Sequence, residues 1–248
     1  MYQLSKLKHI KDKNIMHFIS YHRGVLLLFS LSLFVVVGCG VHDPDNLNRQ
    51  GVSLVNHGNI DEALKMFKKA LKIDPNNRDA HYNIAIACEK KGMVNEAIEE
   101  YRIVLELYPY DPPVLYNLGV LYAKINMIDA AVLSWQKAIE FKPDFLDAHN
   151  AIGFTYLQRK QFDDAIKVYT KVLESKLEDA NIHNNLGIAY TEKGLLNEAI
   201  EEFKKAIQIN PAIAMVHKNL ENTYRKKGME DEANNELKLY EELSEKTN

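Results

Sequence analysis

Residues 180–213 read ANIHNNLGIAYTEKGLLNEAIEEFKKAIQINPAI, and the same arrangement of residues recurs every 34 positions through most of the chain. One column holds alanine in every copy: Ala63, Ala97, Ala131, Ala165, Ala199 and Ala233. Four residues later a mainly aromatic column follows: Phe67, Tyr101, Trp135, Tyr169, Phe203 and Leu237. Twelve residues before each alanine stands a mainly small residue: Gly51, Ala85, Gly119, Gly153, Gly187 and Glu221. Because these columns keep one register over six copies, the period predicts a repeat architecture.

Each copy is predicted to form two antiparallel helices. The small and alanine columns let two backbones approach, and the aromatic column fills the space between one pair and the next. Glycine stands at the turn between the two helices in four copies, where a left-handed residue ends the first helix. Proline closes the second helix in four copies, at Pro75, Pro109, Pro143 and Pro211. A single pair cannot bury its apolar face, so stacking of neighbours is expected to stabilise the array.

These columns resemble those of the tetratricopeptide repeat family. The resemblance implies an all-α fold, a right-handed superhelical α-solenoid of about six helix pairs. The expected repeats are residues 44–77, 78–111, 112–145, 146–179, 180–213 and 214–248, the last with a C-terminal capping helix. Two copies depart from the pattern. In the fourth repeat the turn glycine is replaced by Lys160 and the closing proline by Leu177, which predicts a local distortion there. In the sixth repeat the small residue is replaced by Glu221 and the aromatic residue by Leu237, as is common in a terminal repeat.

The other informative stretch is residues 24–40, GVLLLFSLSLFVVVGCG. Its apolar centre, Val25–Val37, has 13 residues, whereas a membrane-spanning helix takes about 20. A basic front and a short apolar centre are typical of a secretory signal. Val36-Val37-Gly38-Cys39 resembles the lipobox of bacterial lipoproteins. An uncleaved N-terminal anchor is the alternative, and translation from Met16 would give a more ordinary front region.

The lipobox resemblance implies that residues 1–38 are a removed signal peptide, that Cys39 is acylated, and that residues 39–43 form a short linker. Two or more acyl chains make membrane attachment stable. Gly40 stands where an aspartate would retain the protein at the inner membrane. We therefore expect a periplasmic lipoprotein in the inner leaflet of an outer membrane, or at the outer face of the plasma membrane in a cell with one membrane.

Composition and motifs argue against other function classes. The chain has 248 residues, 46% hydrophobic and 26% charged, and a net charge of −3, which suits a globular protein. Residues 1–38 carry +4, so residues 39–248 carry −7, and an acidic body argues against a nucleic-acid partner. Nucleotide-binding, hydrolase and zinc-protease motifs are missing. We expect no enzyme activity, no cofactor, no metal and no small-molecule substrate.

Two residue types invite a chemical role, and both are expected to be structural. Cys88 falls in a column held by tyrosine in four other repeats, which predicts a buried thiol. His81, His149, His183 and His217 share one repeat position. Equivalent residues on stacked helices lie about 8–10 Å apart or more, too far to share one ion. Packing between repeats is the favoured reading, and a pH-sensing or metal role is the alternative.

The resemblance also implies a binding surface. In this family positions five and nine of each first helix line a concave groove. Here we predict a partner-binding groove from Tyr82, Ile86, Tyr116, Val120, Asn150, Phe154, Asn184, Ile188, Lys218 and Asn222. Its middle is apolar with asparagines and its C-terminal end is basic, with Arg225 and Lys226 beside Lys218. Apolar anchors and amides that pair with a backbone suit a peptide segment of a protein partner.

The expected function is a non-enzymatic, lipid-anchored scaffold that assembles protein partners near a membrane. Six such repeats directly behind a lipobox cysteine resemble the lipoproteins of type IV pilus biogenesis, which help to assemble the outer-membrane secretin. An adaptor that organises cell-wall hydrolases is one alternative. A structural oligomerisation unit is the other.

Overall fold

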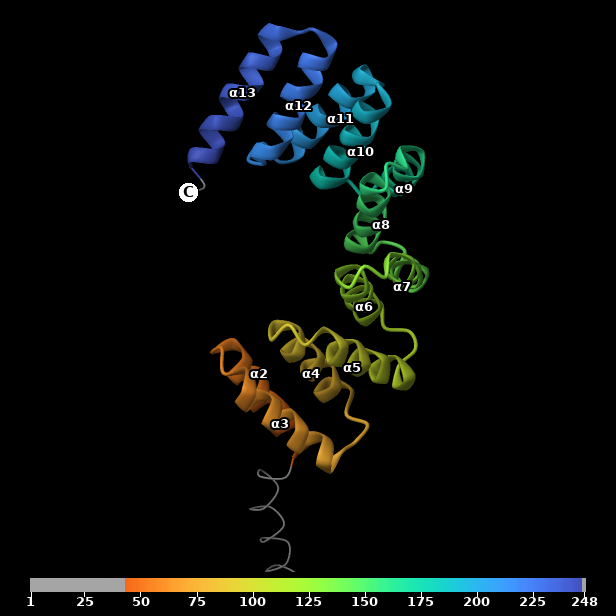
Figure 1. Cartoon of the computed structure of the whole chain (residues 1–248), viewed down its shortest axis with the longest axis vertical. Helices are drawn as coiled ribbons and strands as arrows, with labels where there is room; N and C mark the ends of the chain where they lie inside the picture. Colours follow the sequence, from red (N-terminus) through yellow and green to blue (C-terminus); the bar gives the residue numbers. More distant parts are fainter. Residues whose placement is uncertain (1–42, 247–248) are drawn as a thin grey trace, which may run out of the picture. The chain divides into compact units, whose positions relative to one another are not determined.

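The computed structural model describes residues 43–246, which form twelve helices and no strand (Figure 1). The lipobox and Cys39 lie outside these residues. The helices are α2 (Pro44–Asn56), α3 (Ile60–Ile73), α4 (Arg78–Lys90), α5 (Val94–Leu107), α6 (Pro112–Lys124), α7 (Ile128–Phe141), α8 (Leu146–Gln158), α9 (Phe162–Glu174), α10 (Ala180–Lys193), α11 (Leu196–Ile209), α12 (Ala214–Lys227) and α13 (Glu230–Glu245). None of them is both long and apolar enough to cross a membrane.

The chain divides into two compact units. The first ends at Gly92 and contains α2, α3 and α4, and the second begins at Met93 and contains α5 to α13. Within each unit a helix packs against its predecessor and its successor, as in α2–α3–α4 and in α10–α11–α12–α13. First helices of neighbouring repeats also touch, including α8 with α10 and α10 with α12. The prediction of an all-α solenoid of paired helices is confirmed.

The small column and the aromatic column meet inside each helix pair. A Cβ atom added to Gly187 would lie 2.7 Å from Cε1 of Phe203, and a Cβ on Gly51 would overlap the ring of Phe67. Gly119 and Gly153 stand in the same relation to Trp135 and Tyr169. The two helices can therefore pack this closely because the ring occupies the space that a larger side chain at the small position would fill.

The turn between the two helices of a repeat has one backbone conformation throughout. Its φ is positive at all six positions: Gly58 (80°), Gly92 (76°), Asn126 (64°), Lys160 (58°), Gly194 (80°) and Gly228 (79°). Lys160 thus keeps the left-handed turn although its Cβ makes that conformation costly. The unusual geometry of the fourth repeat lies at its other end. There α9 ends at Glu174 and Lys176 takes a positive φ of 60°, in the repeat that lacks the closing proline.

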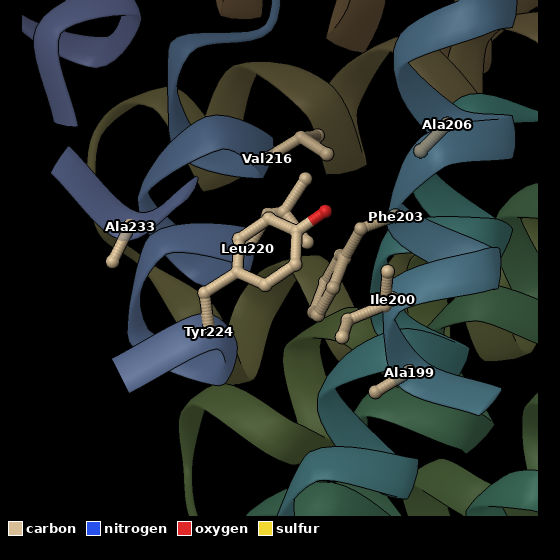
Figure 2. Close-up of a cluster of buried hydrophobic side chains, with 8 residues drawn as sticks. All are labelled: Ala199, Ile200, Phe203, Ala206, Val216, Leu220, Tyr224 and Ala233. Carbon is tan, nitrogen blue, oxygen red and sulfur yellow. The ribbon is translucent and has the colours of Figure 1, made fainter. Parts of the chain in front are cut away.

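Buried side chains form a series of clusters between successive helices. Figure 2 shows one, in which the ring of Phe203 from α11 points toward Leu220 and Tyr224 of α12. Phe203 and Leu220 are each 1% exposed. Cys88 is buried in α4, as predicted.

Candidate functional site

The predicted groove residues lie on first helices, in both units. Tyr82 and Ile86 are half-buried on α4 in the first unit. In the second unit the pairs lie on four helices, Tyr116 and Val120 on α6, Asn150 and Phe154 on α8, Asn184 and Ile188 on α10, and Lys218 and Asn222 on α12. Phe154 is 50% exposed, which is high for a phenylalanine. Asn222 is exposed and the others in this unit are half-buried.

A hollow of about 370 Å³ lies against α10, α11 and α12. It brings together two of the predicted residues, Ile188 and Asn222, and two basic residues noted beside them, Arg225 and Lys226. The hollow is completed by residues that the repeat positions did not indicate: Thr191, Glu192, Phe203 and Asn219. Phe203 belongs to a second helix, so a search confined to first-helix columns could not find it.

Buried contacts hold the lining of the hollow, whose residues are mostly polar. Ile188 and Phe203 are its two apolar residues, and both Phe203 and Thr191 are buried. The hydroxyl of Thr191 lies 2.9 Å from that of Thr223 on α12 and donates to the carbonyl oxygen of Gly187, also at 2.9 Å. A satisfied buried hydroxyl pair fixes α10 against α12 beneath the hollow.

Paired charges form its rim. Lys226 Nζ lies 2.8 Å from Glu192 Oε1, and Arg225 contacts both Glu221 and Glu230. Lys218 lies 3.0 Å from the second oxygen of Glu221 and over the ring of Tyr240. The end of the groove that was expected to be basic therefore has its cations matched by carboxylates.

Glu221 is the buried member of this rim, at 2% exposure. Burial raises the pKa of its carboxyl, but the hydrogen bond from Arg225 and the nearby ammonium of Lys218 outweigh burial and leave the pKa below its ordinary value. The same contact with Glu221 raises the pKa of Arg225. Glu221 is thus held as a carboxylate in the position where the other repeats have glycine or alanine.

Two asparagines of the predicted groove, Asn150 and Asn184, accept hydrogen bonds from asparagines of the next repeat. Asn185 Nδ2 donates to Asn150 Oδ1 at 2.7 Å, and Asn219 Nδ2 donates to Asn184 Oδ1 at 2.9 Å. Each bond joins the first helices of two successive repeats. These two side-chain oxygens therefore already accept a hydrogen bond within the protein. The bonds give the first-helix surface a fixed geometry.

Aromatic rings gather where α6 meets α8. The ring of Tyr116 lies 5.3 Å from that of Phe145, and Lys142 Nζ lies 4.8 Å from the Phe145 ring. Burial, with a smaller effect of Asp147, raises the pKa of the Tyr116 hydroxyl. Such a cluster offers a rigid apolar surface with polar edges.

The four histidines of the shared column are all buried, at 3–8% exposure, and each contacts an oxygen. His81 and His149 contact the carbonyl oxygens of Pro75 and Pro143. His183 and His217 instead contact carboxylates, those of Glu178 and Glu202 and that of Glu236. Among the described residues, no group of three His, Cys, Asp or Glu side chains is placed to hold a metal ion.

Known families match most of the helical region. Four family models match, three described as tetratricopeptide repeat, at residues 48–112, 112–145 and 180–212, and one as TPR repeat, at residues 155–194. Together they cover residues 48–145 and 155–212. Among curated protein sequences, none matches this chain significantly.

Solved structures of similar fold come from several proteins. MamA of Desulfovibrio magneticus RS-1 is 25% identical with a TM-score of 0.61, over 68% of this chain and 96% of that one. PilF of Pseudomonas aeruginosa is 20% identical with a TM-score of 0.66, over 82% and 97% of the two chains. YrrB, described as a TPR protein with an unusual peptide-binding site, is 22% identical with a TM-score of 0.58, over 75% and 94%.

The likeness to PilF and YrrB is one of fold. A tetratricopeptide solenoid is typically a scaffold for protein–protein interaction, without catalysis of its own. The repeat columns, the paired helices and the family matches agree, and the chain belongs to the tetratricopeptide repeat family.

Proposed function

We propose that this protein is a lipid-anchored, non-catalytic adaptor that binds a peptide segment of a partner protein on the first-helix face of its second unit. The hollow against α10, α11 and α12 carries the proposal. Its volume of about 370 Å³ falls in the range of small-ligand pockets, about 300–1,000 Å³. Its mostly polar lining residues beside Ile188 suit a peptide segment whose backbone can form hydrogen bonds with the lining side chains.

The surface around the hollow favours an extended partner over a small molecule. Phe154 on α8 and Asn222 on α12 are both exposed, and both belong to first helices that successive asparagine bonds tie together. A surface that is already fixed loses little entropy when a partner binds. The peptide-binding site described for YrrB, which shares this fold, is consistent with such a use.

The membrane part of the proposal rests on the N-terminal sequence. The lipobox-like residues end at Cys39, and only Gly40 to Asp43 separate this cysteine from the start of α2 at Pro44. Acylation of Cys39 would hold the first repeat close to a membrane surface. Tethering would raise the effective concentration of the adaptor near membrane-bound partners. We place it in the periplasm, on the inner leaflet of the outer membrane.

Within this function we favour a role in type IV pilus assembly, at the secretin. The support is the layout of the chain, six tetratricopeptide repeats directly behind a lipobox cysteine. Deletion of the gene should then reduce the secretin multimers recovered from the outer membrane, and restoring the gene should return them. If the multimers are unchanged and septal cell-wall hydrolysis is altered instead, the adaptor serves cell-wall hydrolases.

Site-specific photo-crosslinking tests the binding face. A photoreactive phenylalanine analogue replaces Phe154 or Ile188 in the full chain, and the control places it at Leu133 on α7, a second helix. Leu133 is 54% exposed, similar to Phe154, so the control matches the probe in accessibility. We expect the same partner protein to be captured from positions 154 and 188 and not from 133. Equal capture from all three positions, capture of the chain itself, or no capture would overturn the peptide-binding proposal.

A further inference from the structure

Two members of the histidine column contact carbonyl oxygens of prolines. His81 Nε2 lies 3.0 Å from the carbonyl oxygen of Pro75, and His149 Nε2 lies 2.9 Å from that of Pro143. A carbonyl oxygen accepts a hydrogen bond, so the ring nitrogen donates. One N–H is enough for this contact, and neutral imidazole has one. Each proline closes the preceding repeat, so each histidine fastens the junction between two repeats.

His183 occupies the same column but lacks its proline. Leu177 stands in the proline's place, α9 ends at Glu174, and Lys176 adopts a positive φ of 60°. The junction is made by carboxylates instead. His183 Nε2 lies 2.7 Å from Glu178 Oε2, and Nδ1 lies 2.5 Å from Glu202 Oε2. The ring is 3% exposed, so water does not replace either contact.

Counting hydrogens gives the charge of this ring. Ionised carboxylates only accept, and neutral imidazole has one N–H and one lone pair. Both nitrogens of His183 face carboxylate oxygens, so both must donate, which only the imidazolium ion can do. Loss of its proton would leave a ring lone pair facing a carboxylate, and that contact would turn from attraction to repulsion.

The contact with Glu178 is the one that can open. The Glu202 side chain is only 11% exposed, lies on α11 and also binds Lys205 at 2.8 Å. The Glu178 side chain is 63% exposed and lies in the segment 175–179 between α9 and α10. Glu178 can turn into water at little cost, whereas Glu202 would leave a buried site and its lysine.

We propose that the junction between the fourth and fifth repeats is a pH-operated latch, in which the protonated His183 holds Glu178 and so tightens the segment 175–179 against α10, and in which the segment loosens when the proton is lost. At His149 the partner is the carbonyl oxygen of Pro143, and a neutral ring also makes that contact. The latch is a property of this junction and operates whether or not a peptide binds.

The charges around the ring set the direction of the switch. Glu178 faces it from the segment after α9, and Glu202 with Lys205 faces it from α11. Burial lowers the pKa of His183, but the hydrogen bonds to Glu202 and Glu178 outweigh burial and raise it above its ordinary value. Burial raises the pKa of Glu202, and its bonds to His183 and Lys205 more than reverse that, so this carboxyl is the ionised partner. The latch is closed at low pH and opens as pH rises through the raised pKa of His183.

Opening this junction would affect the candidate binding face, because both involve α10. His183 precedes Asn184 on α10, the helix that also carries Ile188 of the hollow. The bond from Asn185 to Asn150 ties the same helix to α8. Without the Glu178 contact the segment 175–179 is still held by Leu177, which packs against the core, and by Asp179, which caps α10, but one of the connections that fix α10 relative to the preceding pair is lost.

The first test is a histidine titration by NMR on the full chain. We expect the pKa of His183 to lie above its ordinary value. The variant Glu178→Gln removes the exposed carboxylate and should lower the pKa of His183. Circular dichroism and thermal unfolding of the variant confirm that it is folded.

The second test follows the segment itself by amide hydrogen exchange, corrected for the intrinsic effect of pH. In the wild type, protection of residues 176–182 should fall by about tenfold or more as pH passes the His183 transition, which is the effect of losing one charge-assisted hydrogen bond. In Glu178→Gln the protection should not change across the transition, because a glutamine amide can accept a hydrogen bond from the charged ring and donate one to the neutral ring. Equal wild-type protection on both sides, or a His183 pKa at or below its ordinary value, would overturn the latch, and both results can be obtained from the wild type even if the variant does not fold.

Discussion

Gly187 and Phe203 share one contact: a Cβ atom added to the glycine would lie 2.7 Å from Cε1 of the ring and 2.9 Å from Cδ1. The ring is 1% exposed and lies among Leu220 and Tyr224 of the next helix, so it has little room to move. Gly187→Ala should therefore destabilise the protein by about 1–3 kcal/mol, as overpacking of a core does. The free energy of unfolding in urea measures this.

A second substitution shows whether the ring is the cause. In the sixth repeat the same two positions hold Glu221 and Leu237, so the chain itself accepts a larger residue where the ring is absent. Phe203→Leu should then cost less in the Gly187→Ala background than in the wild type, with a coupling of about 1 kcal/mol. Additive losses would mean that the glycine is needed for another reason.

The left-handed turn of the fourth repeat offers a stabilising change. Lys160 has a φ of 58°, a conformation that costs a residue with a side chain about 1–2 kcal/mol. Lys160→Gly removes this cost but adds freedom to the unfolded chain, worth about 0.5–1 kcal/mol. We expect a net gain of about 0.5 kcal/mol, seen as a higher urea midpoint.

Asn126 provides the matched comparison for that change. It has a φ of 64° in the equivalent turn, and asparagine enters the left-handed region more readily than lysine. Asn126→Gly should therefore change the urea midpoint less than Lys160→Gly. A larger gain at position 126 would show that the turn conformation does not control stability here.

The repeat columns were enough to predict the helix pairs, because Gly187 and Phe203 act within one pair and recur at a fixed spacing. The hydrogen-bond partners of the histidines in the shared column could not be predicted from the repeat columns. His149 and His183 are the same residue at the same position, yet one contacts a carbonyl oxygen and the other two carboxylates. The difference arises from the backbone around Lys176 and from Glu202, 19 residues away, and neither belongs to the columns that define the repeat.

The candidate site was predictable only in part for a similar reason. Ile188 and Asn222 follow from their positions on first helices, whereas Phe203 reaches the hollow from a second helix. The C-terminal end of the groove was expected to be basic because of Lys218, Arg225 and Lys226. That expectation did not include the carboxylates that pair with these three side chains. Glu192 lies one repeat before Lys226, and such pairing depends on the stacking of repeats.

The acyl anchor gives a direct prediction. Cys39→Ser should abolish incorporation of a labelled fatty acid and leave the signal segment uncleaved, because the thiol is the acylated group. The variant should run larger on a denaturing gel than the mature wild type. Cys88→Ser, at the buried cysteine of α4, is the control and should keep both labelling and size. Unchanged labelling in Cys39→Ser would refute the lipoprotein proposal.

The carboxylate of Glu221 predicts a specific acid response. Its lowered pKa means that it contributes stability above its unfolded pKa, and that this contribution is lost as pH falls through the folded pKa. Arg225→Gln removes the strongest partner and leaves a carboxylate that is 2% exposed with Lys218 alone. The variant should be less stable than the wild type near neutral pH, and its acid unfolding should begin at a higher pH.

The control for the Arg225→Gln variant is a substitution of Glu230, the other carboxylate that contacts Arg225. Glu230 lies 3.0 Å from the guanidinium, but its side chain is 62% exposed, and exposed pairs contribute little. Glu230→Gln should therefore leave both the neutral-pH stability and the acid midpoint nearly unchanged. The gap between wild type and Arg225→Gln should also close at low pH, where Glu221 is protonated in both proteins. A gap that is the same at every pH would mean that Arg225 stabilises α12 through packing and not through the buried carboxylate.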